Sequence, residues 1–270
     1  MTSSQKAQNS QIKTVILCGG MGTRLSEETT LRPKPMVSIG AHPILWHIMS
    51  LYGHQGFNNF VLALGYKADT IKEYFLNYHA LSTDFQVDLS NGKLIYEKPP
   101  TTDWKVSLID TGLTTLTGGR LKRLESQLKP QGTFMLTYGD GVADVDINAL
   151  LKFHRSHGKL ATITVVRPSA RFGGVVFEGE TVTQFKEKPQ SGEGWINGGF
   201  FVFEPGVFKY LADDSTVLEG EPLEKLAADR QLMAYQHKGF WQCMDTVRDR
   251  QHLEEYWNSK KAPWKLWPSE

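Results

Sequence analysis

Short apolar runs alternate with amphipathic segments along the first third of the chain, and this alternation restricts the fold more than any other feature. Residues 14–18 (TVILC) and 60–64 (FVLAL) are almost wholly apolar and rich in β-forming residues. Residues 43–53 and 68–77 repeat their apolar positions at helical spacing. Strands that are apolar on both faces and are joined by helices predict a parallel sheet with crossover helices, which is an α/β fold.

The remaining sequence continues this pattern less regularly. Closely spaced β-rich runs between residues 174 and 203 predict antiparallel strands grouped on one side of a site. No internal repeat or low-complexity linker divides the chain, so we expect a loose polar tail over residues 1–12 and one domain over 13–270. Within it we expect an antiparallel subregion at about 167–240 and a C-terminal helix and tail at 248–270. Further strands are predicted at residues 84–88, 93–96, 105–110, 134–138, 161–166 and 232–236, and helices at 119–128, 146–157, 219–229 and 248–257.

Composition excludes several classes of protein. The 270 residues carry 30 Lys and Arg against 29 Asp and Glu, with no basic run dense enough for a nucleic-acid-binding surface. No apolar stretch approaches the ~18 residues that span a bilayer, and the polar N-terminus does not resemble a signal peptide. With only two cysteines, Cys18 and Cys243, these features predict a cytoplasmic protein with no membrane and no nucleic-acid partner.

A glycine-rich loop follows the first predicted strand and reads LCGGMGTRL over residues 17–25. Gly19, Gly20 and Gly22 allow a ligand to approach the backbone, whose amides can form an anion cradle at a strand end. The spacing fits neither the dinucleotide-binding fingerprint nor the Walker loop. Three glycines alone are equally consistent with a plain turn, but the neighbouring Thr23 and Arg24 favour phosphate binding, because a guanidinium is a planar, permanently charged fork.

Ten residues after Arg24, the run Pro33-Lys34-Pro35-Met36 presents one lysine from a stiffened segment. The prolines restrict the local backbone and bias Arg32 and Lys34 toward extended geometry. An isolated lysine is usually solvated, so this run alone carries little weight. Its combination with GGMGTRL at this separation resembles the sugar-1-phosphate nucleotidyltransferases, a family that shares a Rossmann-like fold.

Further segments extend the resemblance from about residue 13 to residue 267. They include PILWHIM, TGGRLKRL, TYGDGVADVDI, FKEKP, WINGGFFVF and LMAYQHKGFWQCMDT. Within the family these segments resemble the glucose-1-phosphate cytidylyltransferases. The resemblance implies a three-layer α/β fold with a mostly parallel central sheet and an added antiparallel sugar-binding region, together with synthesis of CDP-glucose and pyrophosphate from CTP and glucose 1-phosphate. It also implies a place in dideoxysugar and O-antigen or lipopolysaccharide biosynthesis.

The implied chemistry is in-line attack of the sugar phosphate on the α-phosphorus of CTP, assisted by Mg²⁺. Because the nucleophile is already an anion, the difficulty is positioning and charge neutralisation rather than proton removal. Uridylyl or thymidylyl transfer to the same sugar phosphate stays open, since it would need the same phosphate machinery. A catalytically silent regulatory paralogue is a further alternative, although it would have no chemical reason to retain both carboxylates and the basic residues.

The resemblance assigns roles to individual residues of this sequence. Asp140 and Asp245 are the implied metal ligands, although an aspartate in such contexts more often forms a turn or helix cap. The implied catalytic residues are Arg24, Lys34, Asp140, Lys188 and Asp245. The implied sugar-binding residues are Glu187, Lys188, Asn197 and Gly198. The implied nucleotide-binding residues are Leu17, Cys18, Gly19, Gly20, Met21, Gly22, Thr23, Arg24, Lys34, Thr115, Arg120 and Gly139.

Other features favour structural roles. The histidines and cysteines show no zinc-site spacing, and the two cysteines are most simply small core residues. Trp257, Trp264 and Trp267 lie near the C-terminus, where a polar segment would otherwise fray. We expect this segment to dock either on a neighbouring subunit, in keeping with a homo-oligomer that is hexameric in the resembled family, or on its own chain.

Overall fold

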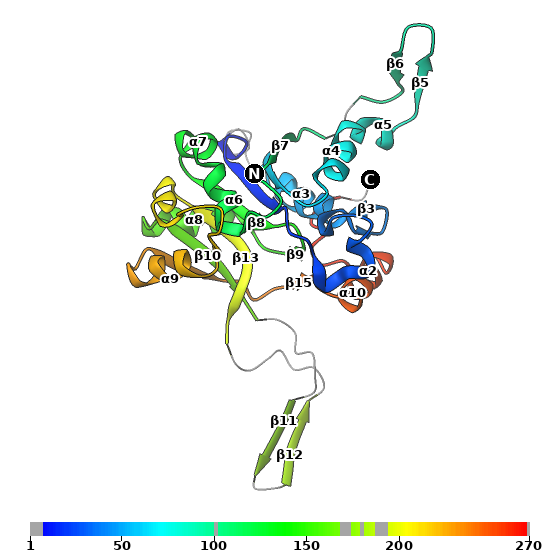
Figure 1. Cartoon of the computed structure of the whole chain (residues 1–270). Coiled ribbons are helices and arrows are strands. Elements are labelled where there is room, and N and C mark those ends of the chain that lie inside the picture. The colour runs from blue at the N-terminus through cyan, green and yellow to red at the C-terminus, as the bar shows by residue number, and fades with distance from the viewer. Residues whose placement is uncertain (1–7, 100–101, 168–173, 179–180, 187–193, 269–270) are drawn as a thin grey trace.

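A seven-stranded, mostly parallel sheet forms the centre of the molecule in a computed structural model, which describes residues 8–99, 102–167, 174–178, 181–186 and 194–268 (Figure 1). Most neighbouring strands run parallel, and only β13 runs antiparallel to both of its neighbours. The α/β prediction is therefore confirmed. In spatial order the strands are β14 (Leu232–Gln236), β10 (Ala161–Val166), β13 (Ile196–Phe203), β8 (Phe134–Tyr138), β1 (Lys13–Cys18), β4 (Asn59–Leu64) and β7 (Lys105–Asp110).

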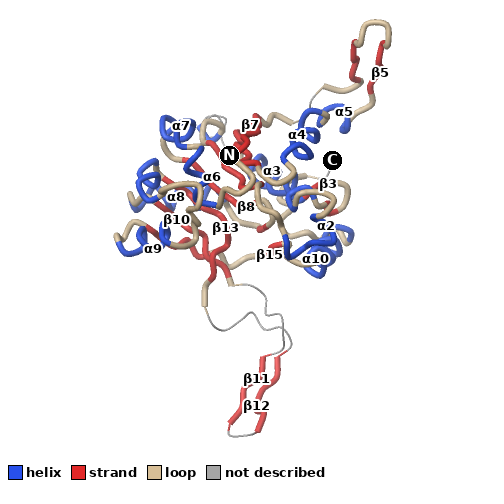
Figure 2. Tube along the Cα trace, in the orientation of Figure 1, coloured by secondary structure: helices blue, strands red, loops and turns tan. Residues whose placement is uncertain are grey.

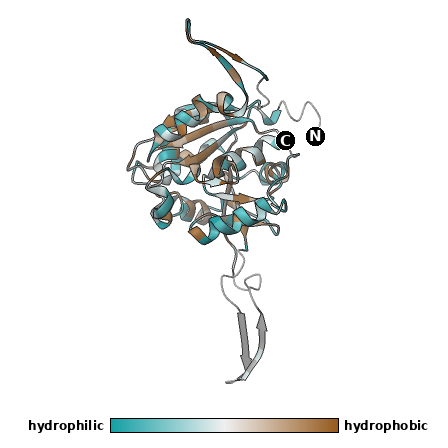
Figure 3. Cartoon of the chain, turned by 90° about the vertical axis from the view of Figure 1, so that its right-hand side faces the viewer, coloured by the Kyte–Doolittle hydropathy of each residue, from teal (hydrophilic) through white to brown (hydrophobic). Residues whose placement is uncertain are grey.

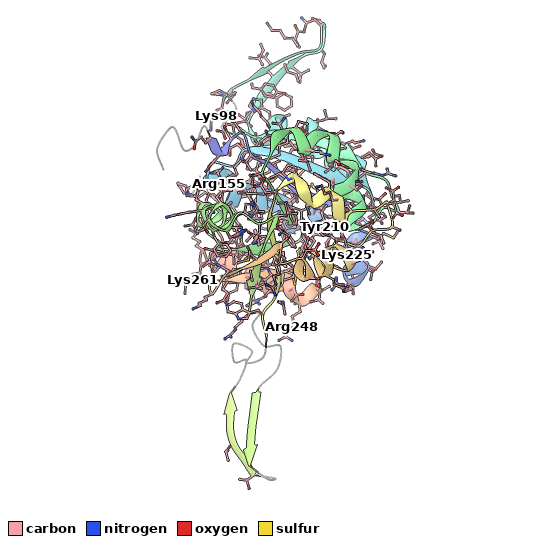
Figure 4. The ribbon with its side chains drawn as sticks, turned by 90° about the vertical axis from the view of Figure 1, so that its left-hand side faces the viewer. Lys98, Arg155, Tyr210, Lys225, Arg248 and Lys261 are labelled. Carbon is pink, nitrogen blue, oxygen red and sulfur yellow. The ribbon has the colours of Figure 1, made fainter. Side chains whose placement is uncertain are left out.

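Helices cover both faces of this sheet and complete three layers (Figure 2). One face packs against α3 (Ile44–His54), α4 (Ala68–Leu76), α8 (Ile147–His157) and α10 (Val247–Asn258). The other face packs against α6 (Thr117–Arg123), α7 (Glu125–Leu128) and α9 (Glu221–Ala228). The central strands are apolar on both faces for this reason, as Figure 3 shows by their brown colour. Charged residues such as Lys225, Arg248 and Lys261 lie on the outside (Figure 4).

Short elements complete the fold. Four two-stranded pairs accompany the main sheet: β2 (Ser38–Ile39) with β3 (His42–Pro43), β5 (Phe85–Asp88) with β6 (Lys93–Tyr96), β9 (Gly141–Ala143) with β15 (Trp241–Cys243), and β11 (Gly174–Glu178) with β12 (Thr181–Lys186). Short helices are α2 (Ser26–Thr29), α5 (Tyr78–Ser82), η1 (Thr23–Leu25), η2 (Lys34–Met36), η3 (Lys129–Gln131) and η4 (Pro205–Tyr210).

Two expectations differ from the structure, and one pair of strands was not expected. The single helix expected over residues 119–128 is divided at Leu124 into α6 and α7. Of the antiparallel strands expected to group on one side of the site, only β11 and β12 form a separate hairpin, whereas β13 lies inside the main sheet. The pair β9–β15 was not predicted, because runs of three residues are too short for a periodicity to show.

The N-terminal segment is ordered further upstream than the expected tail over residues 1–12. Asn9 is fully buried, and its side-chain amide donates to Gln55 O at 3.2 Å and to Asn148 Oδ1 at 2.8 Å. These bonds to α8 and to the residue after α3 fix residues 8–12 against the domain, whereas residues 1–7 lie outside the described residues.

The C-terminal segment docks on its own chain. Trp264 is fully buried, its indole stacks on Phe240 with ring centroids 5.6 Å apart, and its Nε1 donates to His47 Nδ1 at 3.4 Å. Trp257 packs edge-on against His47 at 4.5 Å. The second of the two expected docking modes therefore holds within the protomer. Among the described residues, no helix combines the length and apolarity needed to cross a bilayer.

His47 makes the stability of the domain depend on pH. Burial lowers the pKa of His47 to about 4, so below the ordinary histidine value of about 6.5 the unfolded chain takes up a proton that the folded chain does not. The stability is therefore full above this value and falls as the pH drops toward the folded pKa. We expect His47 alone to account for a loss of about 2 kcal/mol between about pH 7.5 and about pH 5.

Urea unfolding at both pH values tests this effect in the wild type and in His47→Gln. The variant should show the pH-dependent loss reduced by about 2 kcal/mol, because contributions from other groups, including His154 and His157, cancel in the comparison. An equal pH dependence in the two proteins would contradict the assignment.

Candidate active site

A cavity of about 530 Å³ opens at the carboxyl ends of β1 and β8. This edge is where α/β sheets place ligands, because the loops that leave parallel strands meet there. The walls include most of the residues assigned from the sequence. These are Leu17, Cys18, Gly19, Gly20, Gly22, Arg24, Lys34, Thr115, Arg120, Gly139, Asp140, Asn197 and Asp245.

A larger hollow of about 990 Å³ lies beside α8 and is lined in part by Gln55, Asp144 and Arg155, the last of which is labelled in Figure 4. The polar groups of Gln55 are already bonded there, since its Nε2 donates to Val145 O at 3.1 Å and its Oε1 accepts from Ile147 N at 2.7 Å. The smaller cavity is the stronger candidate, because glycine backbone, cations and carboxylates converge only there among the described residues.

The glycine loop is shaped for close approach. Gly22 has a φ of 64°, in the left-handed region, and ends the turn that leads into η1. Nothing lies within 4 Å of a Cβ built at Gly20, so this backbone faces open space. Met21 and Thr23 are exposed and are not part of the cavity wall, unlike the other loop residues assigned to the nucleotide.

Lys34 joins the two predicted metal ligands. Its Nζ lies 2.5 Å from Asp140 Oδ2 and 2.6 Å from Asp245 Oδ1, and its side chain is only 10% exposed. Burial by itself would lower the pKa of Lys34, but both carboxylates act in the opposite direction and the pKa is raised. The ammonium therefore stays charged, and carboxylates 105 positions apart in the sequence meet at one point.

The segment around Lys34 differs from the extended geometry expected for it. Pro33 is extended, but Lys34 itself starts the 3₁₀ turn η2. The turn is stabilised by hydrogen bonds from Met36 N to Pro33 O at 2.8 Å and from Val37 N to Lys34 O at 3.0 Å, and Pro35 and Met36 are buried. These contacts outweigh the local preference of a residue that precedes proline.

Asp245 is positioned by the start of α10. Thr246 and Asp249 form a capping box, and Asp249 Oδ2 also accepts from Asp245 N at 3.2 Å. Arg24, which is 75% exposed on its side chain, pairs with Asp245 from the glycine loop. Two cations thus face two carboxylates, and the cluster is neutral overall.

Arg120 does not present its guanidinium to the cavity as a free cation. It is buried and donates to Leu64 O at 2.9 Å, Gly112 O at 2.7 Å and Gly19 O at 2.9 Å. A Cβ at Gly19 would lie 2.1 Å from the Arg120 guanidinium carbon. Arg120 therefore fixes the glycine loop to the ends of β4 and β7. Because Arg120 also lines the cavity, its expected nucleotide contact stays a prediction.

Gly139 is also explained by contacts within the protein. A Cβ at this position would lie 2.9 Å from both Leu17 O and Pro35 Cγ, so these two residues already require a glycine here. Gly139 also lines the cavity, and its expected nucleotide contact stays a prediction. Cys18 and Cys243 are free thiols whose pKa values are raised by burial, that of Cys243 to about 11. The expected role as a small core residue fits Cys18, which is buried, whereas Cys243 is half-buried in the wall of the cavity.

A second hydrogen-bonded group lines the cavity, and it joins the predicted Asn197 and Gly198 to residues that were not assigned from the sequence. Tyr138 OH donates to Glu219 and accepts from Asn197 Nδ2 at 3.1 Å, while Thr117 Oγ1 donates to Glu219 Oε2 at 2.6 Å. Trp241 Nε1 donates to Gly198 O at 2.7 Å. Tyr138 directly precedes the Gly-Asp pair and could have been suspected from that position, but Glu219 lies in a loop with no sequence signal.

The predicted sugar-side residues are only partly described. Asn197 is half-buried at the start of β13, and Gly198 is buried behind it. Glu187 and Lys188 lie outside the described residues.

The donor set of the cavity suits a hard divalent cation. Asp140 and Asp245 offer carboxylate oxygens to one shared point, and Mg²⁺ in phosphate-transfer sites commonly takes one or two carboxylates and completes its shell with phosphate and water. Among the described residues there is no group of three or more His, Cys, Asp or Glu that could hold a metal ion. The pair therefore fits an ion shared with a phosphate ligand.

A profile of the nucleotidyl transferase family matches residues 13–258. The chain belongs to this family. It is similar to proteins named glucose-1-phosphate cytidylyltransferase from Salmonella typhi, with 48% identity over 95% of this chain and 100% of that protein, and, as a probable member, from Bacillus subtilis, with 44% identity over the same shares. The resemblance found in the sequence motifs is confirmed.

Solved structures support the fold of this nucleotidyl transferase. HddC from Yersinia pseudotuberculosis superposes with a TM-score of 0.66 at 24% identity, covering 91% of this chain and 99% of that one. A UDP-glucose pyrophosphorylase in complex with UDP-glucose gives 0.65 at 17% identity, covering 92% and 99%. At these identities the likeness concerns the fold alone.

Proposed function

We propose that this protein transfers a cytidylyl group from CTP to α-D-glucose 1-phosphate and releases CDP-glucose and pyrophosphate. The observation that carries the proposal is the meeting of Lys34 with Asp140 and Asp245 beside the glycine loop. Relatives at 48% and 44% identity over 95% of the chain bear the name of this activity. Both lines of support point to nucleotidyl transfer, and the relatives supply the choice of base and sugar.

The charged residues of the cavity can reduce the electrostatic repulsion between the two substrates. The sugar phosphate and the triphosphate repel each other, and charge accumulates on the leaving pyrophosphate. Arg24 lies at the rim and Lys34 inside, so both can neutralise phosphate charge, while exposed amides of the glycine loop donate to phosphate oxygens. No general base is needed, because the attacking oxygen is already ionised. Mg²⁺ held by Asp140 and Asp245 would supply further charge neutralisation at the phosphates.

The hydrogen-bonded group on the opposite wall is our proposed sugar side. Asn197 offers an amide, Tyr138 a hydroxyl and Glu219 a carboxylate, which together can donate to and accept from sugar hydroxyls. Glu187 and Lys188 keep their predicted roles at the sugar and its phosphate.

Separate incubations with CTP, UTP, dTTP and ATP test the proposal, each with glucose 1-phosphate and Mg²⁺ and with released pyrophosphate as the readout. We expect CTP to exceed the other nucleotides by about 10²-fold or more, the discrimination expected when buried polar groups must match a base edge. Equal turnover with UTP or dTTP would replace the cytidylyl assignment by the alternative transferases. Binding of CDP-glucose without turnover of any nucleotide would favour the silent paralogue.

We infer that the protein works as a homo-oligomer in the cytoplasm, the hexamer being the expected form. The support for association is the hairpin β5–β6, which projects from the body of the molecule (Figures 1 and 3), whereas the hexamer and the cytoplasm stay expectations from the sequence. Its register places Phe85, Val87, Leu94 and Tyr96 on one face, and all but the half-buried Tyr96 are exposed. An isolated two-stranded hairpin is marginal in water, so a second copy of the chain is the proposed cover for this apolar face.

Sedimentation measures the predicted association. The double variant Val87→Lys/Leu94→Lys should sediment at a lower mass than the wild type, because lysines on this face oppose its burial. Gln86→Lys on the opposite face is the matched control and should keep the wild-type mass. A monomeric wild type, or a double variant of unchanged mass, would contradict the role of this face.

A further inference from the structure

Lys34 occupies the point at which the two carboxylates converge. Its Nζ lies 2.5 Å from Asp140 Oδ2 and 2.6 Å from Asp245 Oδ1, so one ammonium uses one oxygen of each pair. A divalent ion shared by the same two oxygens would have to lie between them, where the ammonium now is. An ammonium and a divalent ion that both lay between these two oxygens would repel each other strongly, so only one of them can occupy this point at a time.

The lysine is held in this position by its own segment. Its side chain is 10% exposed, its backbone starts the turn η2, and the flanking Pro33 and Pro35 limit the conformations that the segment can adopt. A partly buried ammonium with two carboxylate partners is stable where it lies, because removing either partner would leave an uncompensated charge.

Arg24, the second cation of the cluster, differs from Lys34 in its partners and in its exposure. Arg24 pairs only with Asp245, and its side chain is 75% exposed, against 10% for Lys34. Arg24 therefore contributes one positive charge near the same carboxylate without lying between the two. Comparing variants of Lys34 and Arg24 therefore separates the effect of a cation between the two carboxylates from the effect of a positive charge near them.

We propose that Lys34 closes the metal site of the ligand-free protein by taking the place of the divalent ion between Asp140 and Asp245. A divalent ion then enters only when the ammonium leaves for another anion. Given the proposed function, that anion is the triphosphate, so metal and nucleotide enter together and metal does not bind first.

Manganese binding to the protein without nucleotide or sugar tests the proposal, with free Mn²⁺ followed by electron paramagnetic resonance. The wild type should bind Mn²⁺ weakly, and Lys34→Met, which keeps much of the side-chain length but removes the charge, should bind at least about ten-fold more tightly. Arg24→Met is the matched control, with the same change in net charge, and should tighten binding by no more than about three-fold.

The double variant Lys34→Met/Asp245→Asn locates the ion. It should return to the weak binding of the wild type, because one of the two ligands is lost. Circular dichroism of each variant verifies its folding. The proposal is overturned if folded Lys34→Met binds Mn²⁺ no more tightly than the wild type, or if Arg24→Met tightens binding equally. Because neither substrate is present, these outcomes are independent of the proposed reaction.

Discussion

Asp140→Asn is expected to reduce pyrophosphate release by about 10³-fold at a fixed Mg²⁺ concentration, which is the upper range for removing one preorganised charge-stabilising group. Asp140 lies just after β8, 2.5 Å from Lys34 Nζ, and shares that ammonium with Asp245. Asparagine keeps the shape of the side chain but removes its charge, so it weakens the proposed metal site and leaves Lys34 with one carboxylate partner. The measurement is initial-rate pyrophosphate release from CTP and glucose 1-phosphate.

Asp146→Asn is the matched control for this change. The Asp146 side chain caps α8 by accepting from Ala149 N at 2.8 Å, and asparagine caps helices about as well. The control should therefore keep nearly the full rate. If Asp140→Asn released pyrophosphate at the control's rate, Asp140 would have no part in the reaction.

Arg120→Met should lower the free energy of unfolding by about 3–5 kcal/mol, because it removes the hydrogen bonds of a buried guanidinium and takes from Gly112 O its donor, whereas Leu64 O and Gly19 O still accept from Thr111 N and Tyr66 N. The guanidinium bonds Leu64 O, Gly112 O and Gly19 O at 2.7–2.9 Å, and it also donates to Thr111 Oγ1 at 2.8 Å. Arg120→Lys should recover only part of the loss, since one ammonium cannot reproduce the planar fork. Urea denaturation followed by circular dichroism measures each change.

Arg123, one turn further along α6, provides the comparison. It pairs with Asp214 at the surface, where its side chain is 44% exposed, so Arg123→Met should change stability far less. Equal losses for Arg120→Met and Arg123→Met would show that the carbonyl contacts do not stabilise the fold. A stable Arg120→Met protein that had lost only nucleotide affinity would support the direct contact expected from the sequence.

Periodicity was sufficient to predict the parallel core. Residues 14–18 and 60–64 are apolar at every position except Thr14 because helices cover both faces of the sheet, and such runs are visible in one sequence. The place of β13 was not visible, since a strand carries no local mark of whether its neighbours run parallel to it. The division at Leu124 was hidden as well, because a helix and two consecutive shorter helices share the same apolar spacing.

The site was predictable as a set of residue types but not as a set of contacts. Lys34 and Asp140 could be picked out from their residue types and motifs. The ammonium that bridges two carboxylates depends on the tertiary structure, because η2 positions Lys34 and the start of α10 positions Asp245. Arg120 was expected at the nucleotide because the segment TGGRLKRL resembles a nucleotide-contacting segment of the family. Its actual partners are strand-end carbonyls, which no residue type reveals. Glu219 had no signal at all, since its role depends on a hydrogen bond from Tyr138, which lies 81 positions earlier in the sequence.

The direction of β13 has a consequence for how this protein could diversify. Because β13 runs opposite to β8, its first residues, including Asn197, lie at the same edge as the last residues of β8, including Tyr138. The chain that leads into β13 therefore arrives at the rim of the cavity, whereas the pairing that holds the strand begins further inside, at Phe200 with Thr137. If the proposed sugar side is correct, insertions or deletions before residue 196 can alter which sugar is accepted without shifting the register of the core.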